Sequence, residues 1–584
     1  MATTKLPEGL AGNGLASRVW KGAQAHIPLL AATHLPGSAL GMPCARSRCE
    51  RSCFAMSRPR PRGNTRKGHI SLRQFSNEPL LDFSVADNRD RMAEALADVE
   101  TQLGDYYPLI ISGQRVETKS RIASVNPCVH EQAVGYVAQA DKAKAELAME
   151  EAWKAFEIWR EVPAEGRMAT VLRLSALMRR RKAELAAWLV FEVGKNWVEA
   201  DADVAEAIDF CEYYAREMSR YEGLNQIYPH PAERNVQRYI PLGVGVIISP
   251  WNFPLAILTG MTVAAVVAGN TVIIKPANTA GVIAAKLMDL VEEAGFPPGV
   301  INYLPGSGRT IGDYLVQHPR TRFINFTGSK GVGLRINEVA AKCQPGQKWI
   351  KRVVAEMGGK DFIIVDETAD LDDAARGIAK SAFGYQGQKC SACSRAIVVD
   401  SVYDEVVGRV CEIAAQLRVG EAAADFDVNA VIDETAYESI AKYIKIGADE
   451  GKIVLGGGGD SSTGYYIEPT IIEGLSPHAR VAQEEIFGPV LGFIRAASFD
   501  HAIEIANCTD FGLTGSVYSR DRMRLELAKD KAHVGNLYLN RHCTGALVGV
   551  HPFGGFNLSG TDSKAGGPDY LLLFMQAKAI SEAM

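Results

Sequence analysis

The sequence lacks the features that mark several classes of protein. Its formal net charge is only −5 over 584 residues, which gives no electrostatic reason to expect a nucleic acid or an anionic membrane as a partner. The eleven cysteines are irregularly spaced and too sparse for a disulfide scaffold, so a reducing compartment such as the cytoplasm fits best. No internal repeat is found. The composition is that of an ordinary globular chain, 47% hydrophobic and 22% charged, long enough for two to four domains.

One stretch without charged residues, 241–274, is long enough to resemble a membrane span. Two prolines break its first half, and the pair Gly269-Asn270 breaks its second. The apolar, β-branched and small residues between these breaks predict a buried strand–helix–strand unit, and no membrane partner is expected. The predicted strand, turn, helix and second strand are residues 244–248, 249–254, 255–268 and 271–274.

Residues 1–71 differ in composition from the rest of the chain. They hold eleven Lys and Arg but only two acids, Glu8 and Glu50. Two interpretations stay open: a disordered or wrongly assigned extension, with Met42 or Met56 as the start, or an Arg-rich transit segment that would direct the protein to the mitochondrial matrix. No metal site is expected, because no fourth ligand lies at a suitable spacing from the three cysteines of this segment, which are Cys44, Cys49 and Cys53.

From about residue 87 the sequence alternates between helical and strand patterns. Helices are predicted at 89–105, along 142–189 and at 196–222, and the middle segment carries an aromatic stripe that we expect in the core. The stripe consists of Trp153, Phe156 and Trp159. Further strand–helix–strand units follow, and such alternation predicts an α/β fold with mostly parallel sheets. Their strands and helices are 300–303, 310–317 and 323–326, then 362–365, 371–384 and 396–399, with a second α/β segment at 402–538.

A rigid turn, residues 249–254, joins a predicted strand to a predicted helix. Two prolines fix its backbone, so the amide of Asn252 is either a structural cap or a preorganised donor to a developing oxyanion. Lys275 follows the next strand, where open α/β sheets bind ligands. It is either a solvated lysine or a contact to a cofactor ribose or phosphate.

Two further segments carry residue types that suit a nucleotide. The glycine-rich run 326–333 follows a strand and opens a helix, so its backbone N–H groups can approach a phosphate. It lacks the usual Gly-x-Gly-x-x-Gly pattern, and the signal is weak. Glu485 and Phe487 precede an apolar strand, and an acid followed by an aromatic residue can hold a ribose hydroxyl and brace a flat ring. Adjacent acids are otherwise typical of a solvated surface.

Cys390 lies in Gly-Gln-Lys-Cys-Ser, 34 positions after Glu356 in Glu-Met-Gly-Gly-Lys. A thiol is a weak nucleophile until it ionises, with an ordinary pKa of about 8.5, and nearby positive charge such as that of Lys389 lowers this pKa. A carboxylate such as that of Glu356 can then activate the water that releases an acyl group. Cys393 completes a Cys-x-x-Cys pattern, which leaves a redox pair or half a zinc site as rival interpretations.

Taken together and in this order, the segments are similar to those of the aldehyde dehydrogenase superfamily over residues 75–584. The resemblance implies an α/β fold with a Rossmann-type NAD-binding domain, a catalytic domain and a small β oligomerisation arm, and therefore a homo-oligomer. It implies that Cys390 is the nucleophile, Glu356 the base and Asn252 the oxyanion donor. The implied domains are residues 72–226 with 241–356, 357–556, and 227–240 with 557–584. The implied NAD contacts are Ser249, Pro250, Trp251, Lys275, Asn278, Gly328, Ser329, Glu485 and Phe487.

A narrower resemblance concerns the substrate. Segments 383–391, 544–555 and 559–570 are similar to those of family members that oxidise L-glutamate 5-semialdehyde. The resemblance assigns the α-carboxylate of this substrate to Ser391 and to backbone donors in the loop at 545–546, with positive charge nearby, and the α-ammonium to an acid. The implied substrate contacts are Glu206, Phe210, Lys389, Ser391, Gly545 and Ala546.

Two departures from the family pattern bear on this expectation. Asn278 stands where NAD-preferring members usually have glutamate, so use of NADP beside NAD becomes plausible. Cys543 stands where some members carry a serine that helps to anchor the carboxylate. The alternatives are a dehydrogenase of ordinary aliphatic aldehydes, a non-catalytic protein on the same fold, and a thiol-redox protein.

Overall fold

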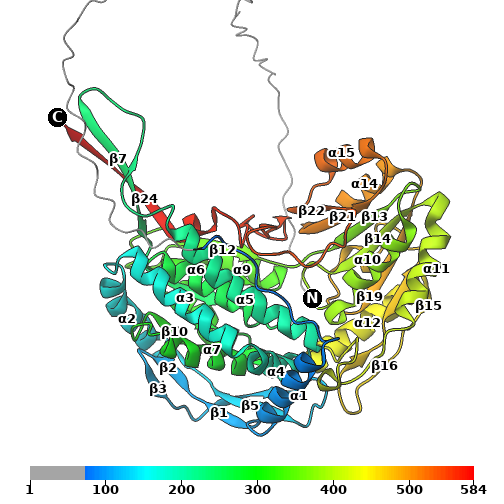
Figure 1. Cartoon of the computed structure of the whole chain (residues 1–584), viewed down its shortest axis with the longest axis horizontal. Coiled ribbons are helices and arrows are strands. Elements are labelled where there is room, and N and C mark those ends of the chain that lie inside the picture. Colours follow the sequence, from blue (N-terminus) through cyan, green and yellow to red (C-terminus); the bar gives the residue numbers. More distant parts are fainter. Residues whose placement is uncertain (1–72) are drawn as a thin grey trace, which may run out of the picture. The chain divides into compact units, whose positions relative to one another are not determined.

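The structure is a computed structural model that describes residues 73–584. The predictions for residues 1–71, including the transit segment and its three cysteines, lie outside the described residues. Everything below concerns the described unit, which Figure 1 shows in colour.

The first of two large sheets has seven strands in the order β12-β11-β8-β9-β10-β2-β3. The five strands from β12 to β10 run parallel, and β2 and β3 form an antiparallel edge. The predicted strand–helix–strand unit is confirmed as β8, α6 (Ala256–Val267) and β9. The strands, in sheet order, are Arg352–Glu356, Phe323–Thr327, Val244–Ile248, Thr271–Lys275, Ile301–Tyr303, Leu109–Ile111 and Gln114–Val116.

Helices pack against this sheet, and one prediction about them is wrong. The stretch predicted as one helical segment, 142–189, is three helices, α2 (Lys142–Trp159), α3 (Ala164–Arg180) and α4 (Lys182–Val193). Pro163 causes the first break, because a proline disfavours the helical conformation in the residue before it. Pro163 is also the N-cap of the next helix, which begins at Ala164. In the aromatic stripe of α2, Phe156 and Trp159 are buried as expected, whereas Trp153 is only half-buried.

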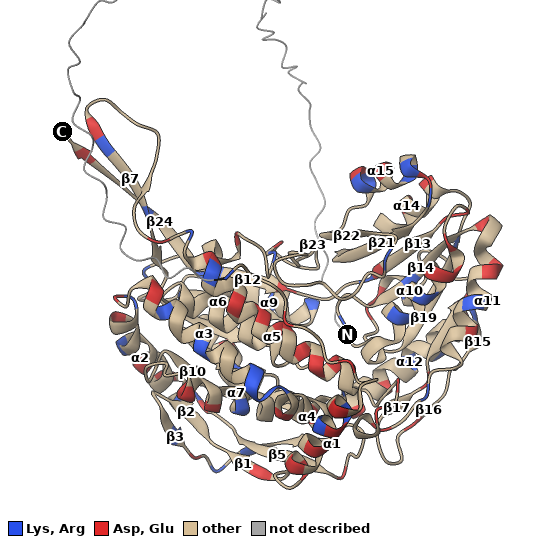
Figure 2. Ribbon diagram, viewed as in Figure 1, with Lys and Arg blue, Asp and Glu red and all other residues tan. Residues whose placement is uncertain are grey.

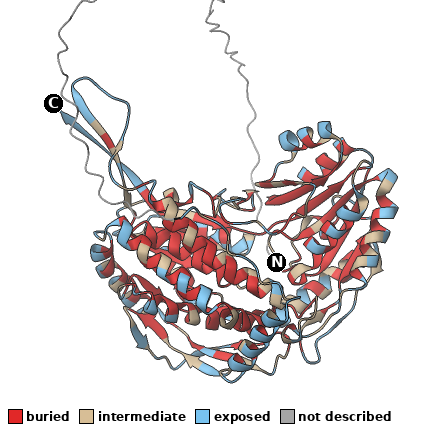
Figure 3. Cartoon of the chain, viewed as in Figure 1, coloured by how far each residue is buried: buried red, intermediate tan, exposed pale blue. Residues whose placement is uncertain are grey.

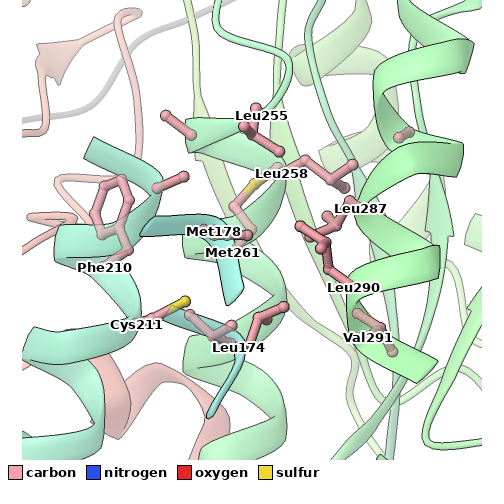
Figure 4. Packing of buried hydrophobic residues seen from close by; sticks show 14 of the residues in the cluster. Leu174, Met178, Phe210, Cys211, Leu255, Leu258, Met261, Leu287, Leu290 and Val291 are labelled. Atoms are coloured by element: carbon pink, nitrogen blue, oxygen red, sulfur yellow. The ribbon is translucent and has the colours of Figure 1, made fainter. Parts of the chain in front are cut away.

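The core beside the sheet is built by α3, α5 (Trp197–Met218), α6 and α7 (Gly281–Glu293). Figure 4 shows side chains of these helices packed together. The first helix, α1, runs from Ala86 to Glu100, so the predicted segment 89–105 begins and ends too late. The predicted helix at 310–317 is a π turn, Gly308–Gly312, followed by the short α8, Asp313–Gln317.

The second sheet also has seven strands, in the order β15-β18-β19-β14-β13-β21-β22. All neighbours run parallel except β15 with β18, so the prediction of mostly parallel sheets is confirmed. The strands, in sheet order, are Lys452–Leu455, Thr470–Glu473, Val490–Ala496, Cys393–Val399, Asp361–Val365, Thr514–Tyr518 and Asn536–Leu539. The helices around it are α10 (Leu371–Phe383), α11 (Tyr403–Ala414), α12 (Glu434–Glu450), α14 (Phe499–Asn507) and α15 (Arg522–Lys531).

The first sheet draws on residues before 357 and the second on residues after it, and a division into NAD-binding and catalytic domains at this point stays a prediction. The smaller elements complete the unit. These are β1 (Asp105–Tyr107), β4 (Arg121–Val125), β5 (Ala133–Ala138), α9 (Lys330–Ala341), β16 (Gly459–Asp460), β17 (Tyr466–Ile467), α13 (Arg480–Gln483), β20 (Phe511–Gly512) and β23 (Phe556–Asn557). Among the described residues no helix is both long and apolar enough to cross a membrane.

A three-stranded arm projects from the unit at the upper left of Figure 1. It contains β6 (Asn225–Gln226), β7 (Glu233–Pro241) and the C-terminal β24 (Met575–Ala583), in the order β24-β7-β6. The arm that the resemblance places at residues 227–240 and 557–584 overlaps β7 and β24, which pair along the whole length of β24, whereas β6 lies before that range. In Figure 3 the outer part of this arm is exposed, whereas the central strands of the second sheet are buried.

Candidate active site

Cys390 lies in the connection from α10 to β14, a strand of the second sheet. Tyr385, Gln386 and Gly387 all adopt left-handed backbone conformations, with φ of 50°, 53° and 66°. Such conformations cost free energy for residues other than glycine and concentrate at functional sites. Buried side chains hold the turn: the hydroxyl of Tyr385 donates to Val193 O, and the amide of Gln386 donates to Gly194 O and Ala430 O. The fold thus fixes the three residues that lead to the nucleophile.

The electrostatic environment of Cys390 differs from the prediction. Burial raises the pKa of its thiol well above the ordinary value, and the negative charge of Glu356 adds to the effect. Lys389 does not counter this, because its ammonium is paired with Glu199 at 2.6 Å. The expectation that Lys389 favours the thiolate is therefore wrong for this structure. Attack by Cys390 needs a base to take the thiol proton.

Glu356, the last residue of β12, is held by the C-terminal part of the chain. Its Oε1 accepts from the N–H of Gly555 at 3.2 Å, and its Oε2 accepts from the hydroxyl of Ser563 at 3.3 Å. Burial raises the pKa of Glu356 to about 8, although both hydrogen bonds lower it. A carboxyl group with a pKa near the working pH is suited to general base catalysis.

Asn252 is buried at the turn that follows β8, as the sequence predicts. One hydrogen of its side-chain amide is donated to the carbonyl oxygen of Gln388 at 3.1 Å. This bond ties the turn to the loop that carries Cys390. A side-chain amide has two hydrogens, so the second remains for an oxyanion that forms on a carbonyl bound at the thiol. Asn252 does not cap α6, whose N-cap is Leu255 without a side-chain bond, and its role as oxyanion donor stays a prediction.

Two buried polar atoms beside the first sheet have unused hydrogen-bonding capacity. The hydroxyl of Ser249 has no hydrogen-bond partner among the described residues. The ammonium of Lys275 has a single one, the carbonyl of Pro276 at 3.1 Å, and burial lowers the pKa of this lysine to about 8. Lys275 can make three such bonds. Asn278 lies exposed three residues further on, so these side chains fit the ribose hydroxyls of a nucleotide.

Two further predicted nucleotide contacts, Gly328 and Ser329, lie where β11 leads into α9. Gly328 donates to the carbonyl of Glu356, and Ser329 is exposed at the N-cap of α9 with its side chain free of a capping bond. A helix N-terminus of this kind attracts phosphate. Figure 1 places α9 behind α5, at the upper edge of the first sheet.

Glu485 and Phe487 lie close to the strand that follows Glu356. The Glu485 carboxyl accepts from the N–H of Gly359 at 3.0 Å, and burial raises its pKa to about 7. A Cβ on Gly358 would come within 2.0 Å of this carboxyl group, so a larger residue there would displace the Glu485 side chain. The ring of Phe487 meets Trp251 edge to face at 5.4 Å, next to Pro250 in the turn. These residues join the two sheets at the predicted nicotinamide site.

The helix α5 carries several acids (red in Figure 2), and one of them, Glu199, reaches the loop of Cys390. Glu199 pairs with Lys389, and the fully buried Asp203 pairs with Lys195 at 3.1 Å. Glu206 has no hydrogen bond or ion pair within the described part of the chain, and burial, with the charge of Asp203, raises its pKa to about 8. A half-buried acid without a partner suits a cationic group on a ligand.

The remaining predicted substrate contacts are placed as follows. Ser391 is buried beside the nucleophile, and its carbonyl accepts from the thiol of Cys543 at 3.4 Å. Gly545 has a left-handed φ of 71° in a loop whose other member, Ala546, is half-buried. Phe210 packs in the core against Tyr214 and Gly260. Its contact with a substrate stays a prediction.

The second cysteine of the Cys-x-x-Cys pattern lies in the second sheet. Cys393 is buried on β14 and donates toward Arg395 O at 3.7 Å. No group of three or more metal-ligating side chains occurs among residues 73–584.

Comparison with known proteins assigns the class. Residues 115–580 match the aldehyde dehydrogenase family, and the chain belongs to this family. Within it, the chain is 57% identical over 513 residues to a 1-pyrroline-5-carboxylate dehydrogenase of Geobacillus thermodenitrificans, covering 88% of this chain and 99% of that protein. It is 56% identical to 1-pyrroline-5-carboxylate dehydrogenase 1 of Halalkalibacterium halodurans, with 88% and 99% covered.

Solved structures agree with this assignment. A 1-pyrroline-5-carboxylate dehydrogenase from Thermus with bound NAD superposes with a TM-score of 0.87 at 54% identity, covering 88% of this chain and all of that one. A betaine aldehyde dehydrogenase from Staphylococcus aureus in complex with NAD⁺ superposes with a TM-score of 0.79 at 27% identity, covering 84% of this chain and 97% of that one.

Several residues of the site were not found from the sequence. Glu199 carried a findable signal, because residues 199, 203 and 206 repeat at helical spacing and place three acids on one face. Ser563 lies in a segment used only for the resemblance, and nothing local connects it with Glu356. The left-handed conformations of Tyr385 and Gln386 have no sequence signal, since neither residue type favours them.

Proposed function

We propose that this protein oxidises L-glutamate 5-semialdehyde, the open form of 1-pyrroline-5-carboxylate, to L-glutamate with NAD. The observation that carries the proposal is Glu206, a half-buried acid that has no hydrogen bond or ion pair among the described residues and whose charge acts on the thiol of Cys390. The substrate has an α-ammonium that matches this acid and an α-carboxylate that matches Ser391 and the loop at Gly545 and Ala546. A site built around such fixed polar partners rejects aldehydes that lack them. The similarity to named 1-pyrroline-5-carboxylate dehydrogenases supports the same substrate.

The residues of the site divide the chemistry among them. Glu356, whose charge acts on the thiol, takes the thiol proton as the Cys390 sulfur bonds to the aldehyde carbon. Asn252 donates its second amide hydrogen to the oxygen that becomes negative. After oxidation the acyl group is held as a thioester on the same sulfur. Glu356 releases the thiol proton to solvent before hydrolysis. Ionised again, it takes a proton from a water, whose oxygen bonds to the acyl carbon while the carbon–sulfur bond breaks and the sulfur takes up a proton to restore the thiol.

NAD, when bound, supplies the acceptor for the hydride that leaves the aldehyde carbon. Lys275 and Ser249 would hold its ribose with unused hydrogen-bonding groups, and Ser329 would meet its phosphates at the start of α9. Glu485 and Phe487 would hold the nicotinamide ribose and ring. Asn278 is exposed and neutral, so it does not repel a 2′-phosphate, and NADP remains an alternative to NAD.

The experiment is a set of steady-state rates with 1-pyrroline-5-carboxylate and with propanal, each with NAD and with NADP. We expect a much higher kcat/KM for the semialdehyde and no turnover in Cys390→Ala, measured as formation of reduced cofactor. Equal values for both aldehydes would instead favour a dehydrogenase of ordinary aliphatic aldehydes. Normal turnover in Cys390→Ala would contradict the mechanism.

The assembly is proposed to be a homo-oligomer formed through the arm. The last strand of the arm is an unpaired edge, and all of its residues except Met575 are exposed. Exposed strand edges are ready to pair with another chain. The compartment, cytoplasm or mitochondrial matrix, stays a prediction that depends on residues 1–71.

A further inference from the structure

The ion pair of Glu199 with Lys389 joins α5 to the residue that precedes the nucleophile. The Lys389 Nζ lies 2.6 Å from Glu199 Oε1, and the two side chains are only 12% and 20% exposed. Both charged groups lie over Gly384, whose absent Cβ would be 3.3 Å from the acid and 3.5 Å from the ammonium. A charge-assisted hydrogen bond of this length is of the strong kind. Glu199 therefore neutralises Lys389, the residue directly before Cys390 in the sequence.

The same face of α5 carries two more acids, and their partners differ. Asp203 is fully buried with Lys195, so these two groups balance each other. Glu206 has neither a hydrogen bond nor an ion pair in the described residues. Glu199 and Asp203 are therefore each paired with a lysine, and Glu206 is the acid of this face that has no partner among the described residues. The group left without a partner is therefore an acid, which can ionise beside a cationic ligand group and which disfavours a further anion.

We propose that Glu199 is a specificity-determining residue: by occupying Lys389, it makes the site select aldehydes that carry an α-ammonium beside the carboxylate over aldehyde acids that lack the ammonium. The inference rests on the proposed function, because it takes the substrate head group to lie between α5 and the loop of Gly545. Without Glu199, Lys389 becomes a free cation that receives a carboxylate directly. The site would then discriminate between two aldehyde acids of the same chain length, one with the amino group and one without it.

The test compares Glu199→Gln with the unaltered protein on two substrates. L-Glutamate 5-semialdehyde and 5-oxopentanoate have the same carbon chain and differ only in the amino group. In Glu199→Gln we expect the ratio of kcat/KM for the semialdehyde over 5-oxopentanoate to fall about tenfold, which corresponds to about 1.4 kcal/mol. The change should come mainly from a lower KM for 5-oxopentanoate, because Lys389 binds the carboxylate before any chemistry.

Matched variants separate this role from a structural one. Glu199→Asp keeps the charge and should keep the ratio near that of the unaltered protein. Glu217→Gln removes an acid from the same helix where it pairs with Arg220, and should leave the ratio unchanged. Lys389→Gln removes the cation and leaves Glu199 as a second unpaired acid, so the ratio should move the opposite way. This variant tests the inference even if Glu199→Gln does not fold.

Two outcomes would overturn the inference. One is a Glu199→Gln protein with a lower unfolding midpoint and an unchanged ratio, which would make the ion pair a structural brace only. The other is a fall of the ratio in Lys389→Gln. A failure of the proposed function looks different, since the unaltered protein would then show no preference for the semialdehyde over 5-oxopentanoate.

Discussion

At the scale of single residues, the site combines a thiol and a carboxyl group whose pKa values are both raised by burial. The pKa of the Cys390 thiol is raised well above its usual value, and that of Glu356 is raised to about 8. A neutral thiol is protected from premature reaction. The proton transfer between the two groups then becomes part of the catalytic cycle, and substitutions that alter Glu356 should affect both attack and thioester hydrolysis.

Glu356→Gln should leave the thioester on Cys390 unable to react with water at a useful rate. The amide has a shape close to that of the acid but cannot accept the proton of the attacking water. We expect the steady-state rate to fall by about 10²–10⁴-fold. Rapid mixing and mass spectrometry of the quenched protein should detect the acyl adduct on Cys390. Loss of all adduct would indicate that Glu356 is needed mainly for the first proton transfer.

Ser563→Ala removes a hydrogen bond that lowers the pKa of Glu356. The base must be ionised to act, so a plot of kcat against pH should rise through the pKa of Glu356. In the variant this rising limb of the profile should move to higher pH. A neutral hydrogen bond of about 0.5–1.5 kcal/mol corresponds to a shift of about half to one pH unit. Ser563→Thr retains the hydroxyl and is the control. A limb that stays in place would show that Ser563 does not act through Glu356.

At the scale of elements, the sequence predicts those parts whose local pattern agrees with their final surroundings. The β-branched runs of β8 and β9 and the small-residue helix α6 between them form as expected, because both faces of the sheet are covered. The same kind of reasoning missed the break before α3, where Pro163 overrides a continuous helical pattern. It also placed Trp153 in the core, although this ring packs at the edge beside Trp349.

The pair of Lys195 and Asp203 braces α5 against the turn that carries Asn252. The Lys195 Nζ lies 3.7 Å from the ring centre of Phe253, and Asp203 accepts from the N–H of Ala256 at 2.7 Å. Lys195→Met leaves a fully buried acid without its partner and should destabilise the fold by about 3–5 kcal/mol. Chemical denaturation checks this.

Two controls accompany Lys195→Met: a double variant of the buried pair and a variant of an exposed pair. Lys195→Met with Asp203→Asn removes both charges and should recover part of the loss, since the amide oxygen can still accept from Ala256. Lys154→Met breaks an exposed pair with Glu151 and should cost at most about 1 kcal/mol. Equal losses in Lys195→Met and Lys154→Met would contradict the bracing role.

At the scale of the whole molecule, the site depends on contacts between residues far apart in the chain. Glu199 meets Lys389 across 190 positions, and Ser563 meets Glu356 across 207. Local patterns contain no information on such pairs. The nucleophile, the base and the oxyanion donor were found from the sequence because their motifs are local. Glu199 and Ser563 could be found only from the structure, because α5 and the C-terminal segment contact the site only after the chain has folded.

The arm is where the whole molecule should meet a second copy. Its β6–β7 connection and β24 expose large apolar side chains, with Tyr228 at 92% and Ile580 at 37%. Exposed apolar groups beside an unpaired strand edge favour association. Tyr228→Glu combined with Ile580→Glu should therefore reduce the molar mass measured by light scattering. Ile158→Glu is the matched control, because Ile158 is 70% exposed on α2, away from the arm. A mass that stays unchanged in the double variant, or falls equally in the control, would exclude the arm as the site of assembly.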